Sequence, residues 1–149
     1  MPVVVLGVGN VLMSDEGVGV RAADLLRERA PPGVRVLSPG AIGPKTVSDV
    51  EGATHLLVLD CVDVGREPGT VVSLDTAGLA PSAVAMSVHE FGVKDLVVLL
   101  GQRGSAPTSV VVVGVQPANV APGLELSSEV EAALPILVEA ALGVLEARA

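Results

Sequence analysis

The chain has 149 residues, a length typical of one domain, and we expect a single domain over residues 1–149. It carries 9 basic and 17 acidic residues, and the net charge of −8 argues against a nucleic acid or an anionic membrane as partner. One cysteine excludes an internal disulfide framework, and the lack of a signal-like segment or of ~18 consecutive apolar residues predicts a cytoplasmic protein.

Apolar runs alternate with amphipathic stretches from the first residues onward, which is the pattern of an α/β layer architecture. Only Phe91 is aromatic, so the core must consist of aliphatic side chains. The continuous apolar run Val3–Val8 predicts a first buried strand. A helix is predicted over residues 16–29, with Asp15 as its cap. Its core-facing side chains are expected to be Val18, Ala22, Leu25 and Leu26.

The middle of the chain predicts a mixed sheet. We expect strands at residues 34–37 and 55–59, with a turn at 39–43 and a short helix opened by Pro44 between them. The next strand, at 71–74, follows after a link too short for a helical crossover, which needs ~10–12 residues or more. This strand must therefore run antiparallel to the strand before it.

The last third of the chain predicts two more helices and a strand. Residues 75–88 read as a loop, residues 92–100 as a helix and residues 108–115 as the last strand. Ser127 or Ser128 can cap a final helix that reaches about residue 147 and that Pro135 should bend.

The glycine-rich turn after the first strand suggests a dinucleotide site, but the rest of the fingerprint is missing. Leu12 stands where the motif needs a third glycine, and Ser38-Pro39 stands where a ribose-binding acid is expected. Asp15 and Glu16 would also repel a pyrophosphate at the helix start. We therefore keep a small nucleotide-binding protein only as an alternative.

Two acidic side chains are predicted to meet at one edge of the sheet. Glu16 follows the first strand and Asp60 ends the strand at residues 55–59. Ligands of open α/β sheets bind outside the carboxyl ends of the strands, where both residues lie. The alternative interpretations are that acids at a helix start only stabilise its dipole, and that Asp60 only closes an Asx turn.

His89 lies on a loop before a predicted helix, a common place for site residues, although a lone histidine is usually a surface or capping residue. Two carboxylates and one imidazole would supply three ligands suited to zinc, nickel or manganese and leave coordination positions open. Spacing alone does not bring all three together. Cys61 and His55 are interpreted as structural residues.

Four stretches of the sequence together resemble the hydrogenase maturation proteases, the endopeptidases that trim the large subunits of nickel–iron hydrogenases. They are Leu6-Gly7-Val8-Gly9-Asn10 continuing to Asp15-Glu16-Gly17-Val18-Gly19, Leu57-Val58-Leu59-Asp60-Cys61-Val62-Asp63, Ser87-Val88-His89-Glu90-Phe91-Gly92, and Val113-Gly114-Val115-Gln116-Pro117. The similarity spans nearly the whole chain. It implies an α/β fold of one domain, with a twisted, mixed but mostly parallel five-stranded sheet sandwiched between helices, as in phosphorylase/hydrolase-like proteins.

The resemblance also implies a site and a substrate. Glu16, Asp60 and His89 fall where the family's metal ligands lie, and the expected metal is nickel carried by the substrate, although other divalent metals can occupy such a site. The expected activity is that of an aspartyl-type endopeptidase that removes the C-terminal extension of an immature hydrogenase large subunit. A nickel-dependent assembly factor without hydrolytic activity is the alternative. One departure is Ser38-Pro39-Gly40, where many relatives carry Asp-Gly-Gly.

Overall fold

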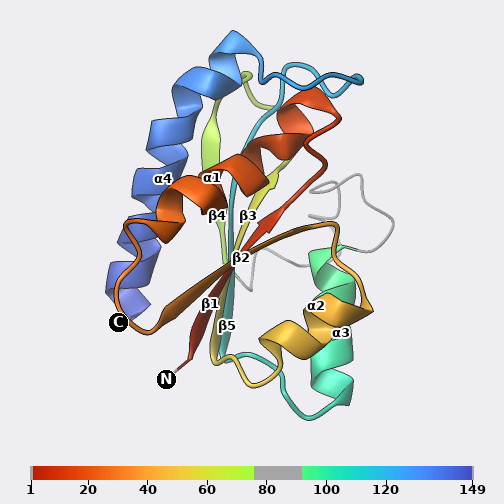
Figure 1. Cartoon of the computed structure of the whole chain (residues 1–149), viewed down its shortest axis with the longest axis vertical. Helices are drawn as coiled ribbons and strands as arrows, with labels where there is room; N and C mark the ends of the chain where they lie inside the picture. Colours follow the sequence, from red (N-terminus) through yellow and green to blue (C-terminus); the bar gives the residue numbers. More distant parts are fainter. Residues whose placement is uncertain (1, 76–91, 149) are drawn as a thin grey trace.

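A computed structural model describes residues 2–75 and 92–148. Its elements form one five-stranded sheet in the order β2-β1-β3-β5-β4, with α1 and α4 on one face and α2 and α3 on the other (Figure 1). In chain order they are β1 (Val3–Val8), η1 (Ser14–Gly17), α1 (Val18–Arg27), β2 (Val34–Gly40), α2 (Pro44–Val50), β3 (His55–Cys61), β4 (Val71–Leu74), α3 (Val93–Gln102), β5 (Ser109–Val115) and α4 (Ser128–Arg148). The predicted fold class is confirmed.

The sheet is mixed because β4 alone runs against its neighbour. β1 pairs in parallel with β2 and β3, and β3 pairs in parallel with β5, whereas β4 pairs with β5 antiparallel. The short link after β3 therefore reverses the chain direction, as predicted. The strand that it leads to lies beside β5, at the edge of the sheet, and not beside β3.

Two aliphatic cores fill the space between the sheet and its helices, and successive residues of β3 alternate between them. Leu57 and Leu59 pack on the side of α1 and α4, while Leu56 and Val58 pack on the side of α2 and α3. This alternation is the period of two expected for a strand that is buried on both faces. No helix among the described residues is long and apolar enough to cross a membrane.

Three local predictions were wrong. The predicted turn at residues 39–43 begins too early, because β2 continues through Gly40; a proline is tolerated there since β2 is an edge strand. The helix predicted from residue 16 begins as the 3₁₀ turn η1, and its Leu25 is exposed. Asp15 does not cap this helix, since its carboxylate binds the segment before α4.

Candidate functional site

The two predicted acidic residues lie at the carboxyl ends of β1 and β3. The chain leaves β1 toward β2 on one side, and the strands after β3 are added on the other side, so β1 and β3 flank the switch point of the sheet. Crevices at such switch points are where open α/β sheets bind ligands. Glu16 lies in η1, which follows β1, and Asp60 is the penultimate residue of β3, so both residues come to this edge.

Gly9 marks the point where the two acidic segments meet. Its φ of +135° is a conformation that glycine adopts readily. A Cβ built on Gly9 would lie 1.8 Å from the carbonyl oxygen of Glu16 and 3.9 Å from Oδ1 of Asp60. The absence of a side chain at Gly9 thus lets the turn that carries Glu16 approach the end of β3.

Both carboxyl groups are withdrawn from solvent. Asp60 is 1% exposed and Glu16 is 7% exposed. Burial raises the pKa of the Asp60 carboxyl well above its ordinary value of 3.8; the hydrogen bond that its Oδ1 accepts from the Cys61 N–H opposes this shift, and the nearby Glu16 carboxylate adds to it. A cation bound here would favour the charged forms of both groups.

The raised pKa of Asp60 predicts how stability depends on pH. Because the native chain holds this proton to a higher pH than the unfolded chain does, it binds more protons between the two pKa values. The Asp60 contribution to the free energy of unfolding therefore falls as pH rises from about 4 through the native pKa. Urea titrations of the metal-free chain should show this fall, and Asp60→Asn should reduce it. Identical pH profiles of the two proteins would contradict the prediction.

His89 lies outside the described residues, so its relation to the two carboxylates stays a prediction. Among residues 2–75 and 92–148, no group of three His, Cys, Asp or Glu side chains is arranged to hold a metal ion. The described part of the site is thus a pair of carboxylates that needs at least one further ligand to form a typical metal site.

The two residues interpreted as structural occupy structural positions. His55 begins β3, at the opposite end of the strand from Asp60, and its Nδ1 lies 2.9 Å from Oγ of Ser109. Cys61 is 9% exposed and belongs to the core on the side of α1 and α4. Burial and the charge of Asp60 raise the pKa of its thiol far above the usual range, which disfavours the thiolate that a nucleophile needs.

Gln116 organises the chain after Asp60, a role that sequence reasoning did not assign. Its side-chain Oε1 accepts hydrogen bonds from the N–H groups of Val64 and Arg66, at 2.8 and 3.2 Å, and its Nε2 donates to Oδ1 of Asp63 at 3.0 Å. The Gln-Pro pair after the last strand was the only sequence signal for it. Gln116 thereby ties the link after β3 to the carboxyl end of β5.

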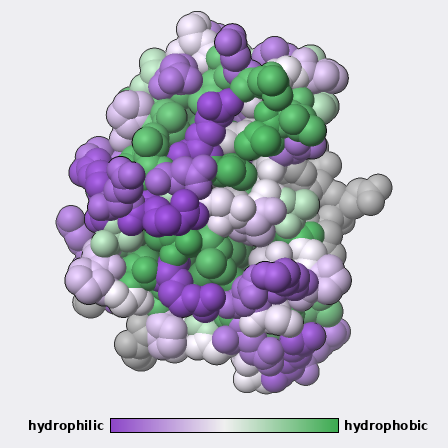
Figure 2. All heavy atoms as spheres, in the orientation of Figure 1, coloured by the Kyte–Doolittle hydropathy of each residue, from purple (hydrophilic) through white to green (hydrophobic). Residues whose placement is uncertain are grey.

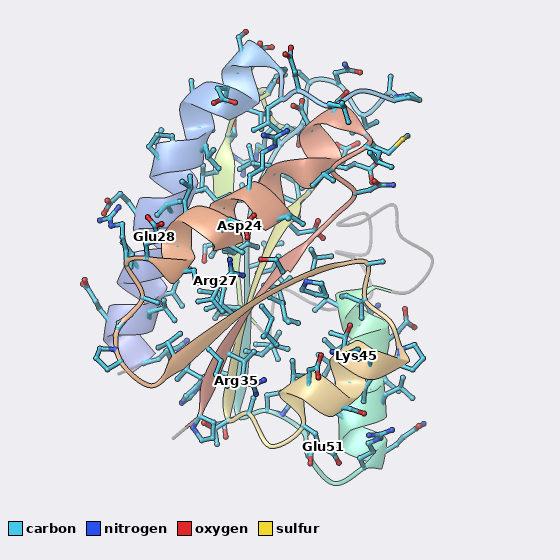
Figure 3. All side chains as sticks on the ribbon, viewed as in Figure 1. Asp24, Arg27, Glu28, Arg35, Lys45 and Glu51 are labelled. Carbon is cyan, nitrogen blue, oxygen red and sulfur yellow. The ribbon has the colours of Figure 1, made fainter. Side chains whose placement is uncertain are left out.

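An open cleft of about 600 Å³ lies between residues 9–12 and residues 38–41, and it is lined by Gly9, the residue that adjoins the Asp60 carboxylate. The described residues that line it are uncharged. Ser38 stands at its edge, where its hydroxyl donates to Oδ1 of Asp24 at 3.0 Å and accepts from Arg27 at 2.8 Å. Figure 3 shows Asp24 and Arg27 projecting from α1 beside β2. The segment that departs from the family pattern thus forms a wall of this cleft.

Exposed apolar side chains surround the same end of the molecule. Figure 2 shows hydrophobic residues gathered near the start of α1. Val11 and Leu12 follow β1, while Val120 and Leu124 belong to the segment between β5 and α4. Leu12 and Leu124 are 60% and 67% exposed. The surface beside the carboxylates is therefore partly apolar.

Comparison with known proteins gives a consistent result. Residues 20–144 match the family model described as hydrogenase maturation protease. The chain is 34% identical to the hydrogenase 2 maturation protease of Escherichia coli K12 over 149 residues, covering 97% of this chain and 91% of that protein. It is 42% identical over 121 residues to the hydrogenase expression/formation protein HupM of Azotobacter chroococcum mcd 1. That match covers 78% of this chain but only 58% of HupM.

Solved structures share the fold over nearly the whole chain. The hydrogenase maturating endopeptidase HybD from E. coli superimposes with a TM-score of 0.90 at 29% identity, covering 99% of this chain and 94% of that one. The [NiFe] hydrogenase maturation protease HybD from Thermococcus kodakarensis superimposes with a TM-score of 0.82 at 28% identity, covering 97% and 99%.

Proposed function

The chain belongs to the hydrogenase maturation protease family, and from this membership we propose that it is an endopeptidase acting in the cytoplasm on an immature hydrogenase large subunit. It removes the C-terminal extension of that precursor after nickel has been inserted. Glu16, Asp60 and His89 recognise the nickel that the substrate carries. The observation that carries the proposal is the meeting of two buried carboxylates at the switch point of the sheet.

The buried carboxylates favour a cationic substrate group. Glu16 lies close enough to Asp60 for its charge to raise the pKa of the Asp60 carboxyl. A divalent ion between them would replace this repulsion by attraction, and carboxylate oxygens are suitable ligands for nickel or zinc. The imidazole of His89 would add a nitrogen ligand. Since the substrate brings the metal, a precursor without nickel would bind weakly and escape cleavage.

The cleft supports a peptide substrate. It is lined by Gly9, which adjoins the Asp60 carboxylate, and its uncharged walls suit an extended chain segment. In the proposed reaction, one carboxylate takes a proton from a water molecule while the water oxygen bonds to the scissile carbonyl carbon. The same group then returns this proton to the leaving amine as the C–N bond of the tetrahedral adduct breaks, which restores the carboxylate. The precursor ends in a new carboxylate, and the extension leaves as a peptide.

Mass spectrometry tests the proposal directly. A hydrogenase large-subunit precursor, prepared with and without nickel, is incubated with the protein. We expect the precursor to lose the mass of its C-terminal extension and the extension to appear as a free peptide. Both changes should occur only with the nickel-loaded form. Binding without any change of mass would instead support a non-hydrolytic assembly factor. Equal cleavage of both precursor forms would refute nickel recognition but not the peptidase activity.

Cys61→Ala should leave cleavage nearly unchanged, within about twofold, because the buried thiol resists ionisation. The loss of a small buried group should lower the free energy of unfolding by about 1 kcal/mol. Initial rates of tail removal and urea titrations check these two expectations. A loss of cleavage in a variant that remains folded would make Cys61 a nucleophile and overturn the assignment of the carboxylates.

A further inference from the structure

We propose that Asp15 is a positioning residue for Glu16, acting through the segment at residues 117–127, which we call the strap. The inference rests on the proposed function, because it concerns the carboxylate assigned to metal recognition. Asp15 is fully buried and precedes Glu16 in η1. The proposed reaction gives it no direct part, and helix capping, its expected role, is not what its side chain does.

The carboxylate of Asp15 is surrounded by donors from the strap. Oδ2 accepts hydrogen bonds from the N–H groups of Ala118 and Asn119, both at 2.9 Å. Ser127 donates its N–H to Oδ1 at 2.7 Å and its hydroxyl to Oδ2 at 2.9 Å. An asparagine has only one acceptor oxygen, so it cannot serve both sets of donors. The site requires a carboxylate of this length.

The backbone before Glu16 is held by the same strap. The N–H groups of Ser14 and Asp15 donate to the carbonyls of Gly123 and Asn119, at 2.9 and 3.0 Å. In return, the Gly123 N–H donates to the Leu12 carbonyl at 2.9 Å. These bonds join segments more than 100 residues apart and fix the main chain on the amino side of Glu16.

Two side chains reinforce the attachment. The hydroxyl of Ser14 donates to the Ala121 carbonyl at 2.7 Å, and the guanidinium of Arg21 on α1 donates to the Leu124 carbonyl. Ser14 has a φ of +53°, which non-glycine residues adopt rarely and only where the surroundings enforce it. The strap thus holds a strained turn whose next residues are Asp15 and Glu16. Loss of the bonds to the strap would let the turn relax and move the Glu16 carboxylate away from Asp60.

Cobalt(II) alone serves as the probe, with its visible absorption reporting both affinity and ligand geometry. We expect wild type to bind the ion, Glu16→Gln to bind it at least tenfold more weakly, and Asp15→Asn to show a similar loss with an altered spectrum. With nickel-loaded precursor, Asp15→Asn should lower kcat/KM at least tenfold, mostly through a higher KM, because the displaced Glu16 recognises the nickel that the substrate carries. Both measurements are made well below the melting temperature of each variant.

Two matched controls separate positioning from folding. Ser127→Ala removes one donor to Asp15, whereas Ser128→Ala changes the neighbouring serine, whose hydroxyl contacts Glu129. We expect a two- to fivefold loss of cobalt affinity only in the first. Leu145→Ala removes most of a buried side chain near the end of α4. This position lies roughly 25 Å along the helix from its first residue, at about 1.5 Å per residue. This substitution should lower the melting temperature without changing cobalt binding.

The possible outcomes distinguish a failure of the role of Asp15 from a failure of the proposed metal site. Cobalt binding by wild type that Glu16→Gln leaves unchanged would overturn the proposed site itself. Weakened binding in Glu16→Gln, with Asp15→Asn and Ser127→Ala equal to wild type, would overturn the role of Asp15 alone. If Asp15→Asn does not fold, Ser127→Ala against Ser128→Ala decides, and equal affinities of that pair would overturn the inference.

Discussion

Asp60→Asn will reduce removal of the C-terminal extension by about 100-fold or more, the size of effect that general acid–base groups supply. The substitution keeps an oxygen that can accept the Cys61 N–H, so the end of β3 should hold its shape. It removes the charge that would attract the substrate's metal. Glu16→Gln should have an effect of similar size. Initial rates on nickel-loaded precursor, read by mass spectrometry, measure both.

Measuring the stability of these variants shows whether a loss of cleavage comes from the site or from unfolding of the protein. Because burial and Glu16 disfavour the charged form of Asp60, the metal-free Asp60→Asn protein should melt at a higher temperature than wild type near neutral pH. Glu139→Gln is a matched control for Glu16→Gln, since Glu139 is exposed and paired with Arg29. It should cleave at the wild-type rate. Undiminished cleavage by Asp60→Asn and Glu16→Gln would refute the site.

Gly19→Ala should destabilise the protein by about 3 kcal/mol, the upper end of the usual cost of overpacking. A Cβ on Gly19 would lie 2.1 Å from the Leu59 carbonyl oxygen and 2.5 Å from the Val8 carbonyl oxygen. Both contacts are with backbone at the ends of β1 and β3, which cannot move aside as a flexible side chain would. The start of α1 must therefore shift and carry η1 with it. Urea titration and cleavage rates should both show the loss.

Gly143→Ala is the matched control for this prediction. Gly143 lies within α4, and a Cβ built on it meets no atom within 4 Å. Alanine favours a helix interior over glycine, by up to about 1 kcal/mol, so this variant should be as stable as wild type or more stable. Equal stability of Gly19→Ala and Gly143→Ala would show that α1 does not pack against the strand ends as described.

Most of the fold could be predicted from the sequence because its signals are local. The apolar runs of β1, β3 and β5 are buried on both faces, and the brief link after β3 forces β4 to run in the opposite direction. The end of β2 was missed because Pro39 is a turn signal in most contexts. Only its place on an edge strand lets it continue the strand.

The carboxylate pair was predictable only in part. Parallel strands bring their carboxyl ends to one edge, so the approach of Glu16 and Asp60 followed from the order of the elements. Resemblance alone added His89. The functions of Asp15 and Gln116 in the structure depend on hydrogen bonds to segments about 50 to 110 residues away, and no local pattern encodes such partners. Asp15 was therefore assigned to the nearest helix.

The attachment of the strap also has a consequence for the order in which the chain folds. Asp15 accepts hydrogen bonds from Ser127, which lies 112 positions later in the chain. Closing so long a loop is entropically unfavourable until the sheet has formed. Contacts between distant segments form slowly, since much of the chain must be in place first. The turn that carries Glu16 should therefore become ordered late, after β5 has joined the sheet. A nascent chain that has not yet reached Ser127 can hold its central strands, but not a finished site.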